Sequence, residues 1–414
     1  MIENIDNNTF LCNGNPGIIY NGHYVVFLPN KMEIVEITRE EYNRGKCLEI
    51  NSLRPLKSTF QSNLARLRLI VTKDCNLRCK YCFARGGEDN IYLNPLIAKK
   101  GLDELIKKDT KYLNIDFFGG EPTLNKDCIK EVVKYSKKKN LRTMFSITSN
   151  GVMDRDILDF MIKNKFIFKI SLDGFKDYHN KMRPMASGEG SYKRVLETIK
   201  RLNMNGSILS LRVTVTQENV KDMPKIVEKY REFNLGYIHF EPMHIEGRGE
   251  IFEKLKPSIK DYVDNFGKSL DIGKKLGISI TSSSLLNLYK PCAIFCSSFQ
   301  GNNIIITPEG YITTCLGVQD YKHNFSSYFI VGKYSEEEKR FIYDKSKIEK
   351  IKREIDVNRN ERCKNCFAKY ICSGSCVLKN KLSGGFDYYG CQINKQLIYD
   401  AIRRIWINSV EPSQ

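Results

Sequence analysis

Between residues 67 and 243, strand-like apolar runs alternate along the chain with segments that have the hydrophobic periodicity of a helix. Apolar runs rich in β-branched and aromatic residues predict six strands, at 67–72, 112–120, 142–151, 166–174, 208–216 and 237–243. Segments with an apolar residue every three to four positions predict the intervening helices, at 94–108, 126–139, 154–164, 190–206 and 222–234. This order predicts an α/β fold with a parallel sheet, which right-handed crossovers curl into a barrel or partial barrel. The active site of such a fold lies at the carboxyl ends of the strands.

The segments on either side of this series have different patterns. Residues 1–62 contain a strand-like stretch at 24–38 and predict a small β-rich module. A longer helix is expected at 257–276. Beyond residue 285 the periodicity fades, and the loop-rich segment 292–391 has too few apolar residues to be stable without bound metal.

Composition narrows the functional classes. The length of 414 residues suits two or three domains. The composition, with 41% hydrophobic and 28% charged residues, is typical of a globular protein. The chain has no apolar run near about eighteen residues and no secretory signal, so we expect a cytoplasmic protein without a membrane partner. The net charge is +18, but lysines alternate with glutamates, as in 348–362, which indicates a solvated surface rather than nucleic-acid binding. An acidic peptide partner also fits this charge.

The 14 cysteines carry the candidate chemistry. Disulfides are not expected in a cytosolic chain, so clustered cysteines there indicate a metal site or catalysis. Eleven of them fall in two clusters, at 75–82 and 292–391. Cys12, Cys47 and Cys128 stand alone, and we interpret them as small hydrophobic residues or surface thiols.

The first cluster directly follows the first strand, with three residues between Cys75 and Cys79 and two between Cys79 and Cys82. Three thiolates this close can share one metal site. Structural zinc sites normally use four ligands, whereas an iron–sulfur cube held by three cysteines keeps one iron open. Zinc or free thiols are the alternative.

This spacing resembles the radical S-adenosylmethionine (SAM) superfamily. The resemblance implies a partial (β/α)6 TIM-like barrel and a [4Fe–4S] cluster whose open iron binds the amino and carboxylate groups of SAM. It also implies reductive cleavage of SAM to methionine and a 5′-deoxyadenosyl radical, with an external electron donor of the flavodoxin or ferredoxin type.

Further positions at the strand ends resemble SAM contacts of the same superfamily. Gly119 and Gly120 let the backbone approach a ligand, and the carboxylate of Glu121 accepts from an ammonium group. By resemblance, Tyr81 packs near the adenine. The remaining implied contacts, with the ribose, the methionine and the SAM carboxylate, are Ser149, Asn150, Ser171, Asp173 and Arg183. Plain turn chemistry, and a surface salt bridge for Arg183, are the alternatives.

The second cluster resembles the SPASM extension of radical SAM enzymes, and the combined resemblance covers residues 65–395. Its eight cysteines supply two sets of four thiolates, so three [4Fe–4S] clusters are implied in all. The family pattern assigns auxiliary cluster I to Cys292, Cys296, Cys315 and Cys376, and auxiliary cluster II to Cys363, Cys366, Cys372 and Cys391. The family motif has seven cysteines. If the eighth, Cys292, is not a ligand, cluster I has an open iron for a substrate thiolate. Two structural zinc sites are the alternative.

The expected domains are an N-terminal module at 1–62, a barrel at 63–284, a SPASM domain at 285–395 and a C-terminal helix and tail at 396–414. The family implies a maturase that crosslinks a ribosomally made precursor peptide through a thioether or carbon–carbon bond, with residues 1–62 as a short leader-binding element.

Two other functions compete with this one. An anaerobic sulfatase-maturating enzyme, which forms formylglycine from Cys or Ser, has an aspartate after the cysteine of the Gly-four-Cys element. This chain has Leu316 there, and the nearest downstream acid is Asp320. A non-catalytic metal-stapled binding protein is the third possibility. The residue that supplies a general acid or base is not identified by the sequence.

Overall fold

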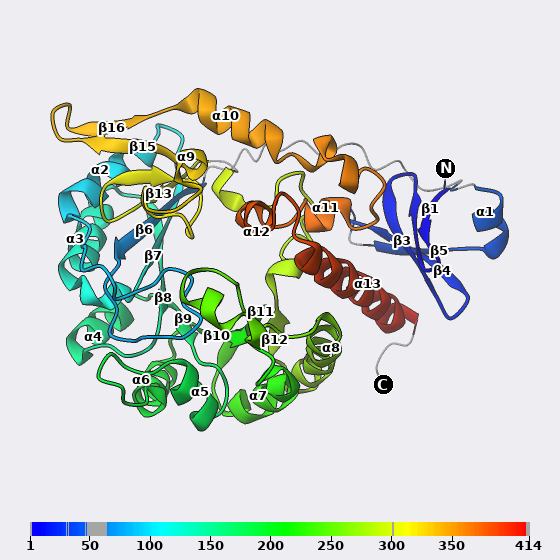
Figure 1. Ribbon diagram of the computed structural model, residues 1–414, viewed down its shortest axis with the longest axis horizontal. Helices are drawn as coiled ribbons and strands as arrows, with labels where there is room; N and C mark the ends of the chain where they lie inside the picture. The colour runs from blue at the N-terminus through cyan, green and yellow to red at the C-terminus, as the bar shows by residue number, and fades with distance from the viewer. Residues whose placement is uncertain are drawn as a thin grey trace. The chain divides into compact units, whose positions relative to one another are not determined.

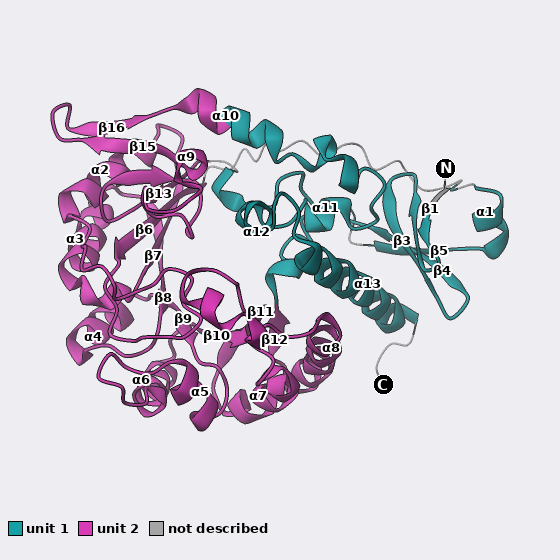
Figure 2. Ribbon diagram, in the orientation of Figure 1, with its two compact units in different colours: residues 1–59, 282–300, 349–414 teal, residues 60–281, 301–348 magenta. Residues whose placement is uncertain are grey.

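The structure is a computed structural model that describes residues 2–29, 31, 33–45, 47, 64–299 and 302–410. It divides into unit 1, with residues 1–59, 282–300 and 349–414, and unit 2, with residues 60–281 and 301–348 (Figure 2). Residues 301–348, which we expected in the SPASM domain, fall in the barrel unit. The expected boundary at residue 62 and the tail at 411–414 lie outside the described residues.

Unit 2 is built on one eleven-stranded sheet, with the order β12-β11-β10-β9-β8-β7-β6-β13-β14-β15-β16. Neighbouring strands pair in parallel from β12 to β13 and antiparallel beyond β13. The strands are β6 (Leu64–Thr72), β7 (Tyr112–Gly119), β8 (Arg142–Ser149), β9 (Ile167–Ser171), β10 (Leu209–Val215), β11 (Leu235–Pro242), β12 (Ser279–Thr281), β13 (Asn302–Ile306), β14 (Tyr311–Thr313), β15 (Ile330–Ser335) and β16 (Arg340–Tyr343). The predicted α/β fold with a parallel sheet is confirmed.

Helices cover the outer side of the curved part of this sheet (Figure 1). They are α2 (Pro95–Leu105), α3 (Lys126–Lys137), α4 (Arg155–Lys163), α5 (Lys176–Met182), α6 (Tyr192–Met204), α7 (Met223–Lys229) and α8 (Ile259–Leu276). The short α9 (Ser326–Phe329) directly precedes β15 and contacts it. Local chemistry sets their ends: the side chains of Asn94 and Asn125 cap α2 and α3, and Gly277 ends α8 in the left-handed conformation.

Side chains on β6 show why the sheet has a helix-covered face and a polar face. Leu67 and Leu69 are fully buried, whereas Arg68 between them is half-buried. The two faces of a strand alternate, so apolar residues pack under the helices and polar residues point into the barrel. On the polar side, Lys169 of β9 pairs with Asp116 of β7 at 3.2 Å. The carboxyl ends of these strands carry the loops that form the candidate site.

Unit 1 begins with a five-stranded antiparallel meander, in which the strand-like stretch at 24–38 forms the hairpin of β4 and β5. Its strands are β1 (Ile2–Asp6), β2 (Thr9–Cys12), β3 (Asn15–Tyr20), β4 (His23–Leu28) and β5 (Glu33–Ile37). The short α1 (Arg39–Asn43) follows, and a capping box between Thr38 and Glu41 fixes its start.

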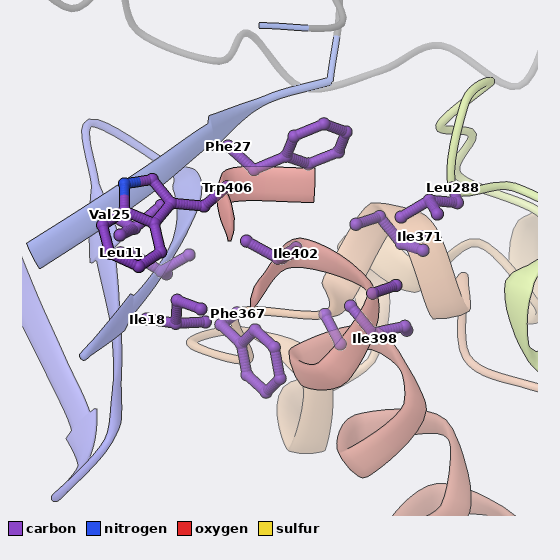
Figure 3. Packing of buried hydrophobic residues seen from close by; sticks show 12 residues of the cluster. Leu11, Ile18, Val25, Phe27, Leu288, Phe367, Ile371, Ile398, Ile402 and Trp406 are labelled. Carbon is purple, nitrogen blue, oxygen red and sulfur yellow. The ribbon is translucent and has the colours of Figure 1, made fainter. Parts of the chain in front are cut away.

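The remaining helices of unit 1 are α11 (Lys369–Cys372), α12 (Val377–Leu382) and α13 (Tyr388–Val410), and α10 (Lys345–Glu354) runs across the division at residue 348. Ile398, Ile402 and Trp406 lie four residues apart on α13, so they form one apolar stripe. That stripe packs on buried residues of the meander and of the cysteine-rich segment (Figure 3), namely Leu11, Ile18, Val25, Phe27, Leu288, Phe367 and Ile371.

One interpretation of the cysteines is wrong. We treated Cys12 and Cys47 as isolated thiols, but the structure joins them in a disulfide. They are 35 positions apart in the sequence, and the fold brings both into a buried cluster with Phe10 and Val26. Cys128 remains a free, buried thiol. Within the described ranges, no helix has the length and apolar composition that crossing a membrane requires.

Candidate functional site

The loop after β6 carries Cys75, Cys79 and Cys82, and nearby N–H groups point at their sulfur atoms. The backbone N–H of Leu77 lies 3.4 Å from the Cys75 Sγ, and that of Gly86 lies 3.4 Å from the Cys82 Sγ. Two side chains add to these contacts: Asn150 Nδ2 is 3.7 Å from the Cys75 Sγ, and Arg183 Nη1 is 3.8 Å from the Cys79 Sγ. Donors of this kind stabilise a thiolate.

The three thiols fit an iron–sulfur cluster by their chemistry. Burial raises the pKa of Cys75 to about 12, with the charges of Glu121 and Cys79 adding to it, and burial raises the pKa of Cys79 to about 11 although Arg183 opposes it. Binding therefore has to displace protons. A donor set of sulfur alone selects soft partners such as iron–sulfur clusters or zinc. In the described part of the chain, no three His, Cys, Asp or Glu are placed to hold a single metal ion.

Glycines bring the loop after β7 against the cysteine loop. A Cβ on Gly119, which has φ +148°, would lie 2.3 Å from the Thr72 carbonyl oxygen. A Cβ on Gly120 would lie 2.2 Å from that of Asp74. Only glycine permits this approach. The structure therefore brings these two predicted residues beside the cysteine loop, and their contact with SAM stays a prediction.

Glu121 connects the ends of β7 and β8. Its buried carboxylate accepts hydrogen bonds from the Asn150 N–H (2.8 Å) and the Ser149 hydroxyl (2.9 Å), and two more from Thr123. Burial nevertheless raises the pKa of Glu121 above its ordinary value. Because both oxygens are engaged within the protein, Glu121 orders the site, and the predicted contact with the SAM amino group is untested.

A second buried group joins Tyr81, Asp173 and Arg183. The fully buried Asp173 carboxylate accepts from the Tyr81 hydroxyl, from Arg183 Nε at 2.8 Å and from the Thr214 N–H at 2.9 Å. The Arg183 guanidinium lies 5.3 Å from the centre of the Tyr81 ring. Arg183 is 8% exposed, so its ion pair is interior rather than a surface salt bridge. Ser171 ends β9 and is half-buried.

His179 supports this group from behind. Its Nδ1 accepts from the Asp173 N–H at 3.2 Å, and its Nε2 lies 3.0 Å from the Ser191 hydroxyl. Burial lowers the pKa of His179 to about 3. The ring is therefore neutral in the folded protein, whereas it takes up a proton near its ordinary pKa when the chain unfolds.

This difference predicts a pH-dependent stability. The folded-state pKa of about 3 lies below the ordinary value of 6.5, so the unfolded state binds the extra proton and stability falls as the pH drops below 6.5. The expected loss approaches about 1.4 kcal/mol per pH unit. Urea unfolding at pH 7 and pH 5.5 should show a smaller loss for His179→Asn, which keeps an acceptor for the Asp173 N–H. Equal losses in both proteins would contradict this role.

Four cysteines of unit 1 are electrostatic neighbours. Burial raises the pKa of Cys372 to about 12, and the charges of Cys366, Cys363 and Cys391 add to the rise. The side-chain N–H of Asn394 donates to the Cys372 Sγ at 3.2 Å. This proximity is what one shared cluster requires, and it agrees with the set assigned to auxiliary cluster II, which stays a prediction.

The cysteines assigned to auxiliary cluster I are divided between the units. Cys376 and Cys296 of unit 1 influence one another electrostatically. The Cys292 Sγ of the same unit lies 3.1 Å from the Ile294 carbonyl oxygen and 3.4 Å from the Ser373 hydroxyl. Cys315 belongs to unit 2. Their grouping, and the role of Cys292 as a ligand, stay predictions from the resemblance.

Ion pairs within unit 2 fix the segment that follows Cys315. Asp320 pairs with Lys73, two residues before Cys75. Lys322 pairs with Asp89 at 3.0 Å, and His323 Nε2 lies 3.0 Å from a Glu246 carboxylate oxygen. Lys73 also pairs with Glu309. The sequence does not single out Lys73, Glu309 or Glu246, because their partners are more than seventy positions away.

Arg248, which the sequence pattern does not single out, also contacts the cysteine loop. Arg248 Nε donates to the Cys79 carbonyl at 2.9 Å, and its backbone N–H donates to the Cys82 carbonyl at 3.0 Å. The sequence feature that could have identified this residue is the Gly-Arg-Gly segment at 247–249, which soon follows the sixth predicted strand.

Comparison with known proteins agrees with this geometry. Residues 69–230 match the family model of the Radical SAM superfamily. Residues 69–230 therefore form a radical SAM domain, and the chain is an enzyme of the radical SAM type, which implies that it uses SAM and a [4Fe–4S] cluster.

Two of the sequence relatives are named for different activities. The chain is 27% identical over 346 residues to a cysteine-type anaerobic sulfatase-maturating enzyme of Clostridium novyi, covering 76% of this chain and 88% of that protein. It is 30% identical over 183 residues to an Fe-coproporphyrin III synthase of Methanosarcina barkeri, covering 43% and 44%.

Two solved structures share the fold. Native anSMEcpe with bound AdoMet and Cp18Cys peptide has a TM-score of 0.65 at 18% identity, over 84% of this chain and 99% of that one. Streptococcus suis SuiB bound to the precursor peptide SuiA has a TM-score of 0.57 at 14% identity, over 92% and 97%.

Proposed function

We propose that this enzyme is a peptide maturase that crosslinks a ribosomally made precursor peptide, through a thioether or a carbon–carbon bond. We infer the radical chemistry from the three-cysteine loop and the buried group of Tyr81, Asp173 and Arg183 that contacts it. The choice of a peptide substrate is supported by the fold shared with SuiB, which was solved with its precursor peptide, over 92% of this chain. The peptide-bound anSMEcpe structure supports the same class of substrate.

The proposed roles follow from the contacts of each residue. Cys75, Cys79 and Cys82 hold the cluster, which together with SAM supplies a 5′-deoxyadenosyl radical after reduction by one electron. Gly119 and Gly120 bring the loop after β7 against the cysteine loop, where SAM is proposed to bind. Arg183, which is held by Asp173, is suited to the SAM carboxylate, because a planar guanidinium binds carboxylates with two parallel hydrogen bonds. Ser149, Asn150, Ser171 and Tyr81 are the proposed ribose, methionine and adenine contacts.

The two auxiliary clusters are part of the proposal. Cys363, Cys366, Cys372 and Cys391 hold cluster II, and Cys292, Cys296, Cys315 and Cys376 hold cluster I. Auxiliary clusters suit a net oxidation because they accept an electron. The five-stranded meander of unit 1 is the proposed leader-binding element. The electron donor of flavodoxin or ferredoxin type and the cytoplasmic location also stay predictions.

Anaerobic reconstitution tests this function directly. Three cubic clusters predict about twelve irons and twelve sulfides per chain. Added SAM and dithionite should give 5′-deoxyadenosine, and a candidate precursor peptide should lose two hydrogen atoms with a new crosslink in its fragment spectrum. Protein that binds zinc without sulfide and makes no 5′-deoxyadenosine would overturn the proposal.

A Cys372→Ala variant tests the second cluster separately. The substitution removes a ligand that lies among three others, so about four irons per chain should be lost while SAM cleavage without peptide persists. Peptide crosslinking should fail. Iron and sulfide counting together with the 5′-deoxyadenosine assay measure both effects. An unchanged iron content would contradict the assignment of Cys372 as a ligand.

Formylglycine formation is the second candidate, and the Clostridium novyi relative favours it. Leu316 replaces the aspartate expected after Cys315. Burial acts to raise the pKa of Asp320, but its bond with Lys73 outweighs this effect and the pKa lies below its ordinary value. Asp320 is therefore a carboxylate held by an ion pair rather than a free base. A sulfatase-derived peptide that gains an aldehyde would favour this candidate over crosslinking.

A further inference from the structure

The segment Gly247-Arg248-Gly249 lies directly on the cysteine loop. A Cβ on Gly247, which has φ +61°, would lie 2.4 Å from the Phe83 carbonyl oxygen and 2.6 Å from that of Cys82. The backbone N–H of Arg248 donates to the same Cys82 carbonyl at 3.0 Å. The segment therefore contacts the loop through its backbone, and glycine at position 247 makes the approach possible.

The Arg248 side chain connects three points of that loop. Its Nε donates to the Cys79 carbonyl at 2.9 Å, one Nη donates to the Gly86 carbonyl at 3.1 Å, and the other pairs with Glu88 at 2.8 Å. The side chain is 16% exposed. A guanidinium presents five donors in a fixed fork, and lysine cannot reproduce this geometry.

This arrangement has a direct consequence for Gly86. Arg248 holds the carbonyl of Gly86, and the N–H of the same residue points at the Cys82 Sγ from 3.4 Å. Fixing the carbonyl restricts the orientation of this residue, so Arg248 maintains an N–H···S contact that it does not itself make. Hydrogen bonds to cysteine sulfur and limited solvent access are among the factors that set the potential of an iron–sulfur cluster.

The positive charge of Arg248 favours the reduced form of the cluster. Reduction adds one negative charge to a cluster, and a fixed cation in a poorly solvated site stabilises the reduced form. Glu88 offsets part of this charge, but its side chain is 44% exposed and therefore better screened by water than that of Arg248, which is 16% exposed. Arg248 comes from the segment after β11, at the far end of the barrel from β6. Its hydrogen bonds therefore connect the loop after β6 with the segment after β11.

We propose that Arg248 is a positioning residue that keeps the three-cysteine loop in its cluster-binding conformation and raises the reduction potential of the cluster held there. This inference rests on the proposed cluster at Cys75, Cys79 and Cys82. Arg248 fixes carbonyl groups of the loop, and no contact with substrate is assigned to it.

The test uses the full-length reconstituted enzyme and variants Arg248→Gln and Arg248→Lys. A dithionite titration followed by electron paramagnetic resonance reports the cluster whose signal changes when SAM is added. At a fixed solution potential, the ratio of reduced to oxidised cluster should fall about tenfold in Arg248→Gln, which equals about 59 mV for one electron. Arg248→Lys should show a smaller fall in the same direction.

Arg85→Gln is the matched control. Arg85 lies in the same loop and is half exposed, and its guanidinium bonds to the Gly247 carbonyl and to Glu250. Its removal should leave the ratio at the wild-type value. Iron counting identifies variants that fail to load the cluster, and Arg248→Lys provides the comparison if Arg248→Gln does not load.

The outcomes separate the two proposals. A wild-type protein without a reducible, SAM-responsive cluster overturns the proposed function and this inference together. A wild-type protein with such a cluster, and loaded Arg248 variants whose reduced-to-oxidised ratio equals the wild-type ratio, overturns the role of Arg248 alone. A ratio that falls equally in Arg85→Gln also overturns it, because the effect would then be one of general surface charge.

Discussion

Cys79→Ala is expected to abolish formation of 5′-deoxyadenosine. Cys79 lies between the other two cysteines in the sequence of the loop, and its Sγ is 3.8 Å from Nη1 of the buried Arg183. Without it, two ligands remain for a cluster that normally has three or four cysteines. Anaerobic reconstitution followed by chromatographic quantification of 5′-deoxyadenosine measures the loss.

Cys128→Ala is the control for this variant. Cys128 is equally buried but lies on α3, away from the cysteine loops in sequence. Its loss should cost about 1 kcal/mol of folding stability and should leave SAM cleavage intact. If Cys79→Ala produces 5′-deoxyadenosine at the wild-type rate, the assignment of the first cluster is wrong.

Asp173→Ala is expected to lower the free energy of unfolding by about 3–5 kcal/mol, because it leaves the buried Arg183 guanidinium without its carboxylate. The same change removes the acceptor of the Tyr81 hydroxyl and of the Thr214 N–H. SAM binding should also fail, since Arg183 and Tyr81 lose the group that positions them. Urea unfolding and SAM titration by calorimetry measure the two effects.

Asp159→Ala provides the matched surface substitution. Asp159 pairs with Arg201 at 2.6 Å, but the two side chains are 46% and 30% exposed. Pairs of this kind contribute about 0.2–1 kcal/mol, so the variant should unfold close to the wild type and bind SAM normally. Equal destabilisation by the two substitutions would show that the Asp173–Arg183 pair has no special structural role.

Much of unit 2 follows from local patterns in the sequence. The apolar runs and helical periods predict the barrel strands within two or three residues of β6 to β11, because each of these strands is buried beneath helices and has to be apolar. Cap residues such as Asn94 and Asn125 mark where α2 and α3 start. The spacing of the first three cysteines identifies the candidate site because all three lie within one short loop.

The sequence did not determine the parts that depend on distant partners. The Cys12–Cys47 disulfide, the addition of β13 to β6 and the position of residues 301–348 in the barrel unit arise from long-range pairing.

The site shows the same division. The sequence by itself supplies the thiols, the glycines and the charged residues of the chemistry. The tertiary structure alone decides that Asp173 holds Arg183 and Tyr81, that Glu121 is occupied by its own neighbours and that Arg248 returns to the cysteine loop. Hydrogen bonds and ion pairs depend on distance in space, and residues far apart along the chain carry no local pattern that reveals such a contact.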